Sequence, residues 1–174
     1  MTNIVLSKFI YSHYPDPHYQ KPKADYVPYF EDMQRFSQAY LDREMLTQKS
    51  GYSFFELIEM AIRDHPSLLS ALLQVELIIF THSCYEYDSL YSHVGPALAE
   101  KYHLHAELLD VIEEGDLSIE TAEHVLSAYF AQENIKSGLI IGLEQHVMPL
   151  RSNKNTQLPK CSSVNVLLYN ASSV

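Results

Sequence analysis

The pattern of apolar and polar positions is most regular after residue 51. Ser53 and Glu56 stand three residues apart before an apolar stripe, which is the spacing of a capping box at a helix start, and Pro66 ends that helix. After a short apolar helix, residues 75–80 (VELIIF) form a nearly unbroken apolar run. Such a run is typical of a strand buried on both faces. The pattern therefore predicts two helices that lead into a central strand.

Helical and strand patterns continue to alternate along the rest of the chain. The expected elements are a helix at 95–102, a strand at 106–111, a long helix at 118–134, a strand at 138–144 and, after a polar stretch, a last strand at 164–169. Strand, helix and strand in this order predict parallel crossovers, so we expect an α/β fold whose mostly parallel mixed sheet carries helices on both faces. In such sheets ligands gather at the carboxyl ends of the strands.

The first third of the chain is less regular and is rich in tyrosine and proline. We expect a strand at 3–11 and then an irregular arm at 12–30, since proline disrupts both helices and ladders. A helix at 29–45 is expected next, because its apolar residues recur at helical spacing: Phe30, Met33, Phe36, Ala39 and Tyr40.

Size and charge narrow the possible functions. The 174 residues are expected to form one domain, 1–174, and 22 acidic against 12 basic residues give a net charge of -10. This net negative charge excludes a broad positive surface for binding nucleic acid or anionic lipid. The residues that come closest to a basic patch are Arg151, Lys154 and Lys160. No apolar tract reaches the ~20 residues of a membrane span. Two cysteines without CxxC spacing and no signal pattern favour a cytoplasmic protein.

The succession of elements carries a family resemblance. Residues 75–83 (VELIIFTHS), 94–111 (VGPALAEKYHLHAELLDV), 124–146 (HVLSAYFAQENIKSGLIIGLEQH) and, more loosely, 161–174 (CSSVNVLLYNASSV) follow one another as the matching strands and helices do in the N-terminal half of the beta-ketoacyl-acyl-carrier-protein synthase III family. The resemblance rests on the order and spacing of all these segments together, and no single motif is specific to the family. It implies half of a thiolase-like fold.

The resemblance also implies a nucleophilic cysteine on the hinge after strand 106–111, where a helix N-terminus lowers the thiol pKa. In this sequence that position falls on Gly115. The His and Asn of the family's condensing reaction belong to its second half, which this sequence does not reach. We therefore expect no acyl-enzyme at this hinge, and no cofactor.

Three acids, Glu113, Glu114 and Asp116, surround Gly115. The simpler interpretation is helix capping, since acids near a helix N-terminus interact favourably with its dipole by ~0.3–1 kcal/mol. The alternative is a carboxylate pair, Glu113 with Glu114 or Asp116, in which like-charge repulsion holds one proton for acid–base catalysis.

A second candidate site ends the strand at 75–80, where His82, Ser83 and Cys84 follow one another. Histidine with cysteine can form a thiolate nucleophile or part of a metal site. Zinc needs four organised ligands, however, and the other histidines are scattered. We interpret these residues as packed spectators, expect no metal site, and keep His82 as an acid–base candidate.

The resemblance implies a subunit interface as well. The family pairs the strand that leads into its active-site helix across a two-fold axis, and uses the loop after strand 75–80 to touch the partner. The residues that this places at an interface are His105, Glu107, Leu109, Tyr85, Tyr87 and Tyr91.

Two functions follow from these observations. The first is a catalytically inactive, ketoacyl-synthase-like accessory protein in fatty-acid-like or specialised-metabolite synthesis, acting as a homodimer or in a complex with a synthase-like enzyme. Its 47% hydrophobic content suits a chain with a further face to bury. The alternative is an enzyme of altered chemistry on an acyl thioester or carbonyl substrate, with the hinge carboxylates as acid and base. A third interpretation is a remnant of a longer gene.

Overall fold

The structure is a computed structural model of the chain. It describes residues 3–15, 26–48, 51–83, 94–112, 117–132, 135–148, 150–151, 154–155, 157 and 159–172.

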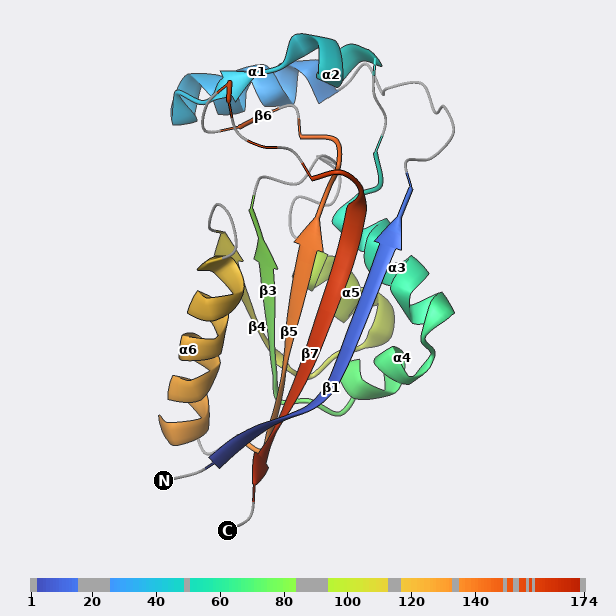
Figure 1. The fold of residues 1–174 in the computed structure, drawn as a ribbon, viewed down its shortest axis with the longest axis vertical. Helices are drawn as coiled ribbons and strands as arrows, with labels where there is room; N and C mark the ends of the chain where they lie inside the picture. Colours follow the sequence, from blue (N-terminus) through green and yellow to red (C-terminus); the bar gives the residue numbers. More distant parts are fainter. Residues whose placement is uncertain are drawn as a thin grey trace.

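A five-stranded mixed sheet forms the centre of the molecule (Figure 1). Its strands, in spatial order, are β1 (Asn3–Tyr14), β7 (Ser162–Ser172), β5 (Ser137–Glu144), β3 (Leu77–His82) and β4 (Glu107–Ile112). β3 pairs in parallel with β4 and β5, whereas β7 is antiparallel to both of its neighbours. Four of the strands therefore point the same way, and the expected mostly parallel mixed sheet is confirmed.

Helices cover both faces of this sheet, as expected from the order of elements (Figure 1). α3 (Phe54–Asp64), α4 (Ser67–Leu72) and α5 (Val94–Tyr102) share one apolar core with the sheet, and α6 (Leu117–Gln132) packs on the opposite face. α5 connects β3 to β4, and α6 connects β4 to β5. These are the two predicted parallel crossovers.

The start of α3 shows why the local sequence fixes this arrangement. The Ser53 hydroxyl accepts a hydrogen bond from the Glu56 amide at 3.1 Å, and the Glu56 carboxylate accepts one from the Ser53 amide at 2.8 Å. This reciprocal pair satisfies two amides that the first helical turn leaves open. The predicted capping box is confirmed, and α3 ends at Asp64, two residues before Pro66.

β3 is the centre of both cores, and all six of its residues are buried, as its apolar run predicts. Ile78 and Phe80 face the core of α3–α5, while Leu77 and Ile79 face α6. α6 comes very close to the sheet, because a Cβ at Gly138 would lie only 2.5 Å from Leu126 Cδ1.

The single helix expected at 29–45 is wrong. The structure has α1 (Tyr26–Ser37), then β2 (Tyr40–Leu41) and then α2 (Arg43–Gln48). Gln38 has a φ of 57°, a left-handed backbone that ends α1, and Phe36 is 88% exposed instead of joining the predicted apolar stripe.

A small layer of its own replaces that helix. β2 pairs antiparallel with β6 (Leu150–Arg151), and Phe30, Leu41 and Val147 lie in a separate apolar cluster there. Figure 1 shows this layer above the carboxyl ends of β3 and β5. Within the stretch 12–30, residues 12–14 continue β1 and residues 26–30 belong to α1, so both ends of the expected arm are regular.

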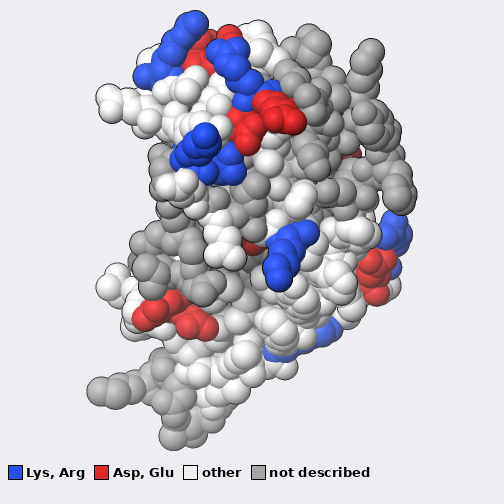
Figure 2. Space-filling view, turned by 45° about the horizontal axis from the view of Figure 1, so that its top comes forward, with Lys and Arg blue, Asp and Glu red and all other residues white. Residues whose placement is uncertain are grey.

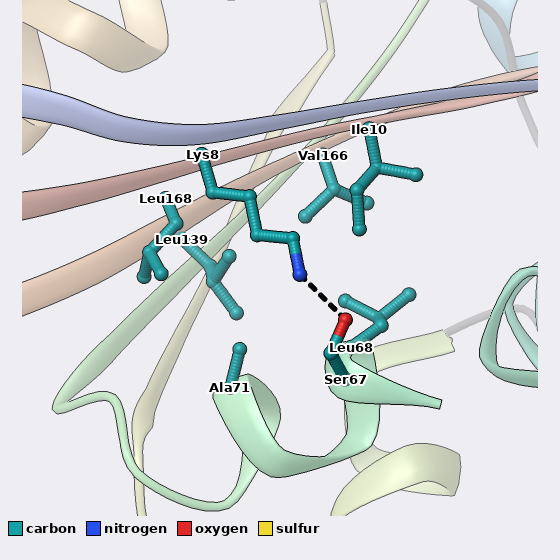
Figure 3. Close-up of a pocket in the computed structure, with 8 residues that line it drawn as sticks. All are labelled: Lys8, Ile10, Ser67, Leu68, Ala71, Leu139, Val166 and Leu168. Carbon is teal, nitrogen blue, oxygen red and sulfur yellow. Dashed lines mark hydrogen bonds between the residues drawn. The ribbon is translucent and has the colours of Figure 1, made fainter. Parts of the chain in front are cut away.

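A small cavity lies between β1 and α4 (Figure 3). The Lys8 side chain crosses apolar residues such as Leu139 and Val166, and its amine donates to the Ser67 hydroxyl at 2.5 Å. The cavity volume is about 10 Å³, room for little more than one water molecule. It is therefore a packing defect rather than a substrate pocket.

Candidate functional site

The carboxyl ends of β3 and β5 meet at one edge of the sheet, below the α1–α2 layer (Figure 1). His82 at the end of β3 stands in register with Leu143, so Ser83 and Glu144 follow on neighbouring strands. The Ser83 hydroxyl donates a hydrogen bond to Glu144 Oε2 at 2.5 Å. The edge that the strand order marks for ligands thus carries a hydroxyl and a carboxylate in direct contact.

His82 is enclosed at this edge. Its side chain is buried, and its ring packs against the Phe54 ring at the start of α3, with 4.9 Å between centroids and 51° between planes. An imidazole held against an aromatic ring has one face closed to a substrate. This environment supports the packed role proposed from the sequence.

The segment after β5 forms hydrogen bonds to residues distant in sequence. Gln145 is fully buried, and its amide donates to the Tyr52 carbonyl oxygen at 2.6 Å. The His146 ring nitrogen Nδ1 lies 2.9 Å from the Pro159 carbonyl oxygen, and the His146 amide donates to the Ser162 hydroxyl at 3.1 Å. The sequence reasoning did not single out Gln145, although a polar residue directly after a buried strand is the signal for it.

The α1–α2 layer is anchored by Arg151. Its guanidinium donates to the Asp42 carboxylate at 2.7 Å and lies 5.1 Å from the centre of the Tyr40 ring. Arg151 is buried by these contacts, whereas Lys154 and Lys160 are exposed. The three cations therefore do not form one exposed basic patch.

Charges on the face turned forward in Figure 2 are mixed, and basic side chains of the α1–α2 layer lie beside acidic ones. Arg35 pairs with Asp32 at 3.0 Å, and Arg43 pairs with Glu31 at 2.7 Å. Such exposed pairs contribute little stability. They do neutralise the cations that an anionic partner would seek.

The acidic hinge, Glu113, Glu114, Gly115 and Asp116, lies outside the described residues, and so do Cys84, Tyr85, Tyr87 and Tyr91. What the structure does place are the two ends of the hinge. β4 ends at Ile112, which is paired with His82, and α6 begins at Leu117. The described ends of β4 and α6 thus lie on either side of the predicted hinge position.

The three remaining interface candidates lie on or beside β4. Among the described strands, β4 pairs only with β3, so it forms one edge of the sheet. His105 and Glu107 are exposed and Leu109 is half-buried, and Glu107 Oε1 accepts a hydrogen bond from the Tyr129 hydroxyl at 2.7 Å.

The largest pKa shifts belong to two tyrosines away from the carboxyl ends of the strands. Burial, together with a hydrogen bond to Glu59, raises the pKa of Tyr102 to about 12. Burial and a hydrogen bond to Glu123 raise the pKa of Tyr169 further. Both hydroxyls stay protonated at neutral pH and act as donors that link helices to neighbouring elements.

Within the described ranges, no group of three or more His, Cys, Asp or Glu side chains is placed to hold a metal ion. No helix in this part of the chain is long and apolar enough to cross a membrane. Cys161 is partly buried as a free thiol.

Comparison with known proteins connects the fold to condensing enzymes. No protein-family model and no curated protein matches the chain. Among solved structures, AbyA1, described as a tetronic acid condensing enzyme, aligns with 99% of this chain and 56% of its own at 10% identity and a TM-score of 0.57. OleA H285A from Xanthomonas campestris aligns with 98% of this chain and 57% of its own, at 10% identity and a TM-score of 0.54.

PksG, an HMG-CoA synthase from Bacillus subtilis, aligns with 99% of this chain and 42% of its own, at 11% identity and a TM-score of 0.54. The chain thus spans about half the length of the solved chains that it matches. Identities this low compare folds only. On that comparison, the resemblance inferred from the sequence is confirmed for the fold, and the chain has the architecture of half a thiolase-like α/β fold.

Proposed function

We propose that this protein acts by association, as a catalytically inactive ketoacyl-synthase-like accessory protein that pairs with itself or with a biosynthetic enzyme. The observation that carries the proposal is the β4 edge, defined as the outer side of Glu107–Ile112. This strand leads directly into the hinge, and among the described strands only β3 pairs with it. An edge strand presents unpaired backbone groups that another strand can satisfy.

The side chains of β4 suit pairing with a second copy across a two-fold axis. An axis through Leu109 places Leu109 opposite its own copy, Asp110 opposite the other copy's Leu108, and Glu107 opposite the other copy's Val111. No two acids then stand directly opposite each other, which avoids the repulsion of like charges across strands. Ile112, 52% exposed, becomes covered.

Catalytic inactivity is proposed from Gly115, which stands in the sequence at the expected nucleophile position. The packing of His82 against Phe54 supports it, because the one described acid–base candidate is enclosed. The solved structures support the choice of pathway, since one is described as a tetronic acid condensing enzyme and another as an HMG-CoA synthase. A partner that condenses acyl groups is therefore the class we propose.

Sedimentation velocity across a range of concentrations tests the β4 edge. Ile112→Lys places a charge on the edge, a common means by which edge strands avoid pairing. Leu73→Lys is the matched control, because Leu73 is equally exposed, at 52%, but follows α4. We expect Ile112→Lys to weaken self-association or binding of a coexpressed synthase at least tenfold and Leu73→Lys to leave it unchanged. Equal behaviour of the two variants contradicts the proposal.

A second function, an enzyme of altered chemistry on an acyl thioester or carbonyl compound, is favoured by the contact between Ser83 and Glu144 beside His82. A carboxylate that accepts from a hydroxyl can draw its proton during attack on a carbonyl. The test is turnover of short acyl-CoA thioesters by the unmodified protein, Ser83→Ala and Glu144→Gln. Thioester loss that both variants abolish supports the enzyme, and no turnover excludes it for this substrate class.

A further inference from the structure

Residues 26–48, which form α1, β2 and α2, pack mainly on one another. Together with β6 they make their main contacts among themselves, and within the described part of the chain their apolar cluster shares no member with the two cores of the central sheet. Figure 1 shows this segment above the carboxyl ends of β3 and β5. We call residues 26–48 the cap. The cap is therefore packed separately from the sheet whose edge it overlies.

The cap meets residues 147–148 and 150–151 at a narrow contact, which we call the seam. The ladder of β2 with β6 has two pairs, Tyr40 with Arg151 and Leu41 with Leu150. The Met148 amide also donates across the seam, to the Met45 sulfur at 3.1 Å. β5, in contrast, is paired along most of its length with both β3 and β7. Because few backbone hydrogen bonds close the seam, its local opening should need less free energy than opening of the sheet.

The seam also buries a charge that is incompletely satisfied. The Arg151 side chain is 7% exposed and donates through Nη2 to the Asp42 carboxylate at 2.7 Å. Its Nε atom is buried without a hydrogen-bond partner. A buried donor without an acceptor destabilises the state that buries it, and desolvation of an ion pair can exceed the attraction between its charges. Separation of β2 from β6 would return the guanidinium to water, which favours opening.

Contacts inside the cap favour movement as one body. Arg43 of α2 pairs with Glu31 of α1 at 2.7 Å, and the Gln34 side-chain amide donates to the Ala39 carbonyl oxygen at 3.4 Å. Phe30 of α1 is fully buried in the cluster that the cap forms with the seam. These bonds hold α1, β2 and α2 to one another, and none of them has to break when the seam opens.

We propose that the cap opens as a unit at the seam while the central sheet stays folded, and that this motion controls access to the carboxyl ends of β3 and β5. The closed and open forms differ by the separation of β2 from β6. Opening uncovers the strand ends that lead into Ser83 and Glu144. The device requires neither pairing at the β4 edge nor a catalytic role for Ser83.

Hydrogen exchange at single amides tests the opening. We expect the amides of α1 and of Met148 to exchange at least tenfold faster than those of β3 and β5. Asp42→Asn removes the charge that faces Arg151, while its side-chain oxygen can still accept from the Met45 amide at the start of α2. This variant should speed exchange in α1 at least tenfold further. Asp32→Asn is the control, because Asp32 pairs with Arg35 inside α1 at 3.0 Å. Equal exchange in α1 and β3, or equal acceleration of both by Asp42→Asn, overturns the proposal.

A disulfide across the seam tests the same motion without changing the ion pair. Leu41→Cys and Leu150→Cys stand directly opposite each other in the ladder, in a chain whose two native cysteines are replaced by serine. The reduced form of this variant is the control for its oxidised form. We expect oxidation to slow exchange in α1 at least tenfold and to leave β3 unchanged. Unchanged exchange in α1 after complete oxidation contradicts opening at the seam.

The control of access is tested by a thiol at the strand end. Ser83→Cys, with both native cysteines replaced by serine, is alkylated with iodoacetamide, and the rate is measured alone and combined with Asp42→Asn or Asp32→Asn. We expect Asp42→Asn to raise the rate at least tenfold and Asp32→Asn to leave it unchanged. Equal rates in all three proteins overturn the proposal that the cap controls access to this edge.

Discussion

The two faces of the central sheet differ in how completely they are covered, and β1 shows the difference within one strand. Its residue Ile10 is buried under α3 and α4, while its neighbour Phe9 is mostly exposed on the α6 face. Helices cover the α3–α5 face of the sheet with one continuous core. On the opposite face, the core lies only under the single helix α6. The exposed part of the second face is therefore the outer side of β1.

The largest expected effect is the loss of stability when a buried side chain on the α3–α5 face is removed. Phe80 is fully buried under α5, so Phe80→Ala should lower the free energy of unfolding by about 3–5 kcal/mol, as urea titration would show. Phe9→Ala, at a protein concentration where only monomer is present, should change it by less than about 1 kcal/mol. Similar losses for the two variants would mean that the α6 face is packed as fully as the other.

The next effect concerns how closely α6 approaches the sheet. Gly138→Ala places a Cβ about 2.5 Å from Leu126 Cδ1, so the buried Leu126 side chain or the helix that carries it must shift, and we expect a loss of about 1–3 kcal/mol in urea titration. Gly142→Ala, whose Cβ would lie 3.3 Å from the Thr81 hydroxyl oxygen, should cost less. A larger loss for Gly142→Ala than for Gly138→Ala would contradict the close approach of α6 to the sheet.

A smaller effect is expected from the cap of α3. Ser53→Ala removes the side chain that accepts from the Glu56 amide and should lower the free energy of unfolding by about 1 kcal/mol. Ser127→Ala, on the exposed side of α6, should change it by less than about 0.5 kcal/mol. Thermal unfolding followed by circular dichroism would separate the two variants.

The smallest expected effect is a change in stability at high pH. On each face of the sheet, one tyrosine hydroxyl bonds to a glutamate. The folded-state pKa of Tyr102 is about 12, above the ordinary value of 10.0, so its contribution to stability is complete below pH 10 and is lost as the pH rises through 12. Tyr102→Phe should therefore flatten the fall in the unfolding free energy between pH 10 and 12. An unchanged slope would show that burial and Glu59 do not hold this proton.

Most of the α/β core was predictable from the sequence because its signals are local. Ser53, Glu56 and Pro66 bound α3 by capping and chain geometry, and the apolar run of β3 reports burial on both faces. The alternation of these elements then implies parallel crossovers and the faces that the helices cover.

The parts that sequence missed depend on contacts between distant residues. The break at Gln38 has no glycine to announce it, and it is stabilised by the pairing of β2 with β6, more than a hundred residues away. The Ser83–Glu144 contact and the burial of Gln145 likewise require the register of β3 with β5. The unequal cover of the two faces follows from where α6 sits, which no periodicity specifies.

The most direct test of the central claim is sedimentation velocity of the unmodified protein over a wide range of concentrations. The chain has a mass of 20.0 kDa. Association through the β4 edge predicts a species of at least twice that mass, whose population grows with concentration. A single species of the chain mass at every concentration, alone and with a coexpressed synthase, would contradict the account.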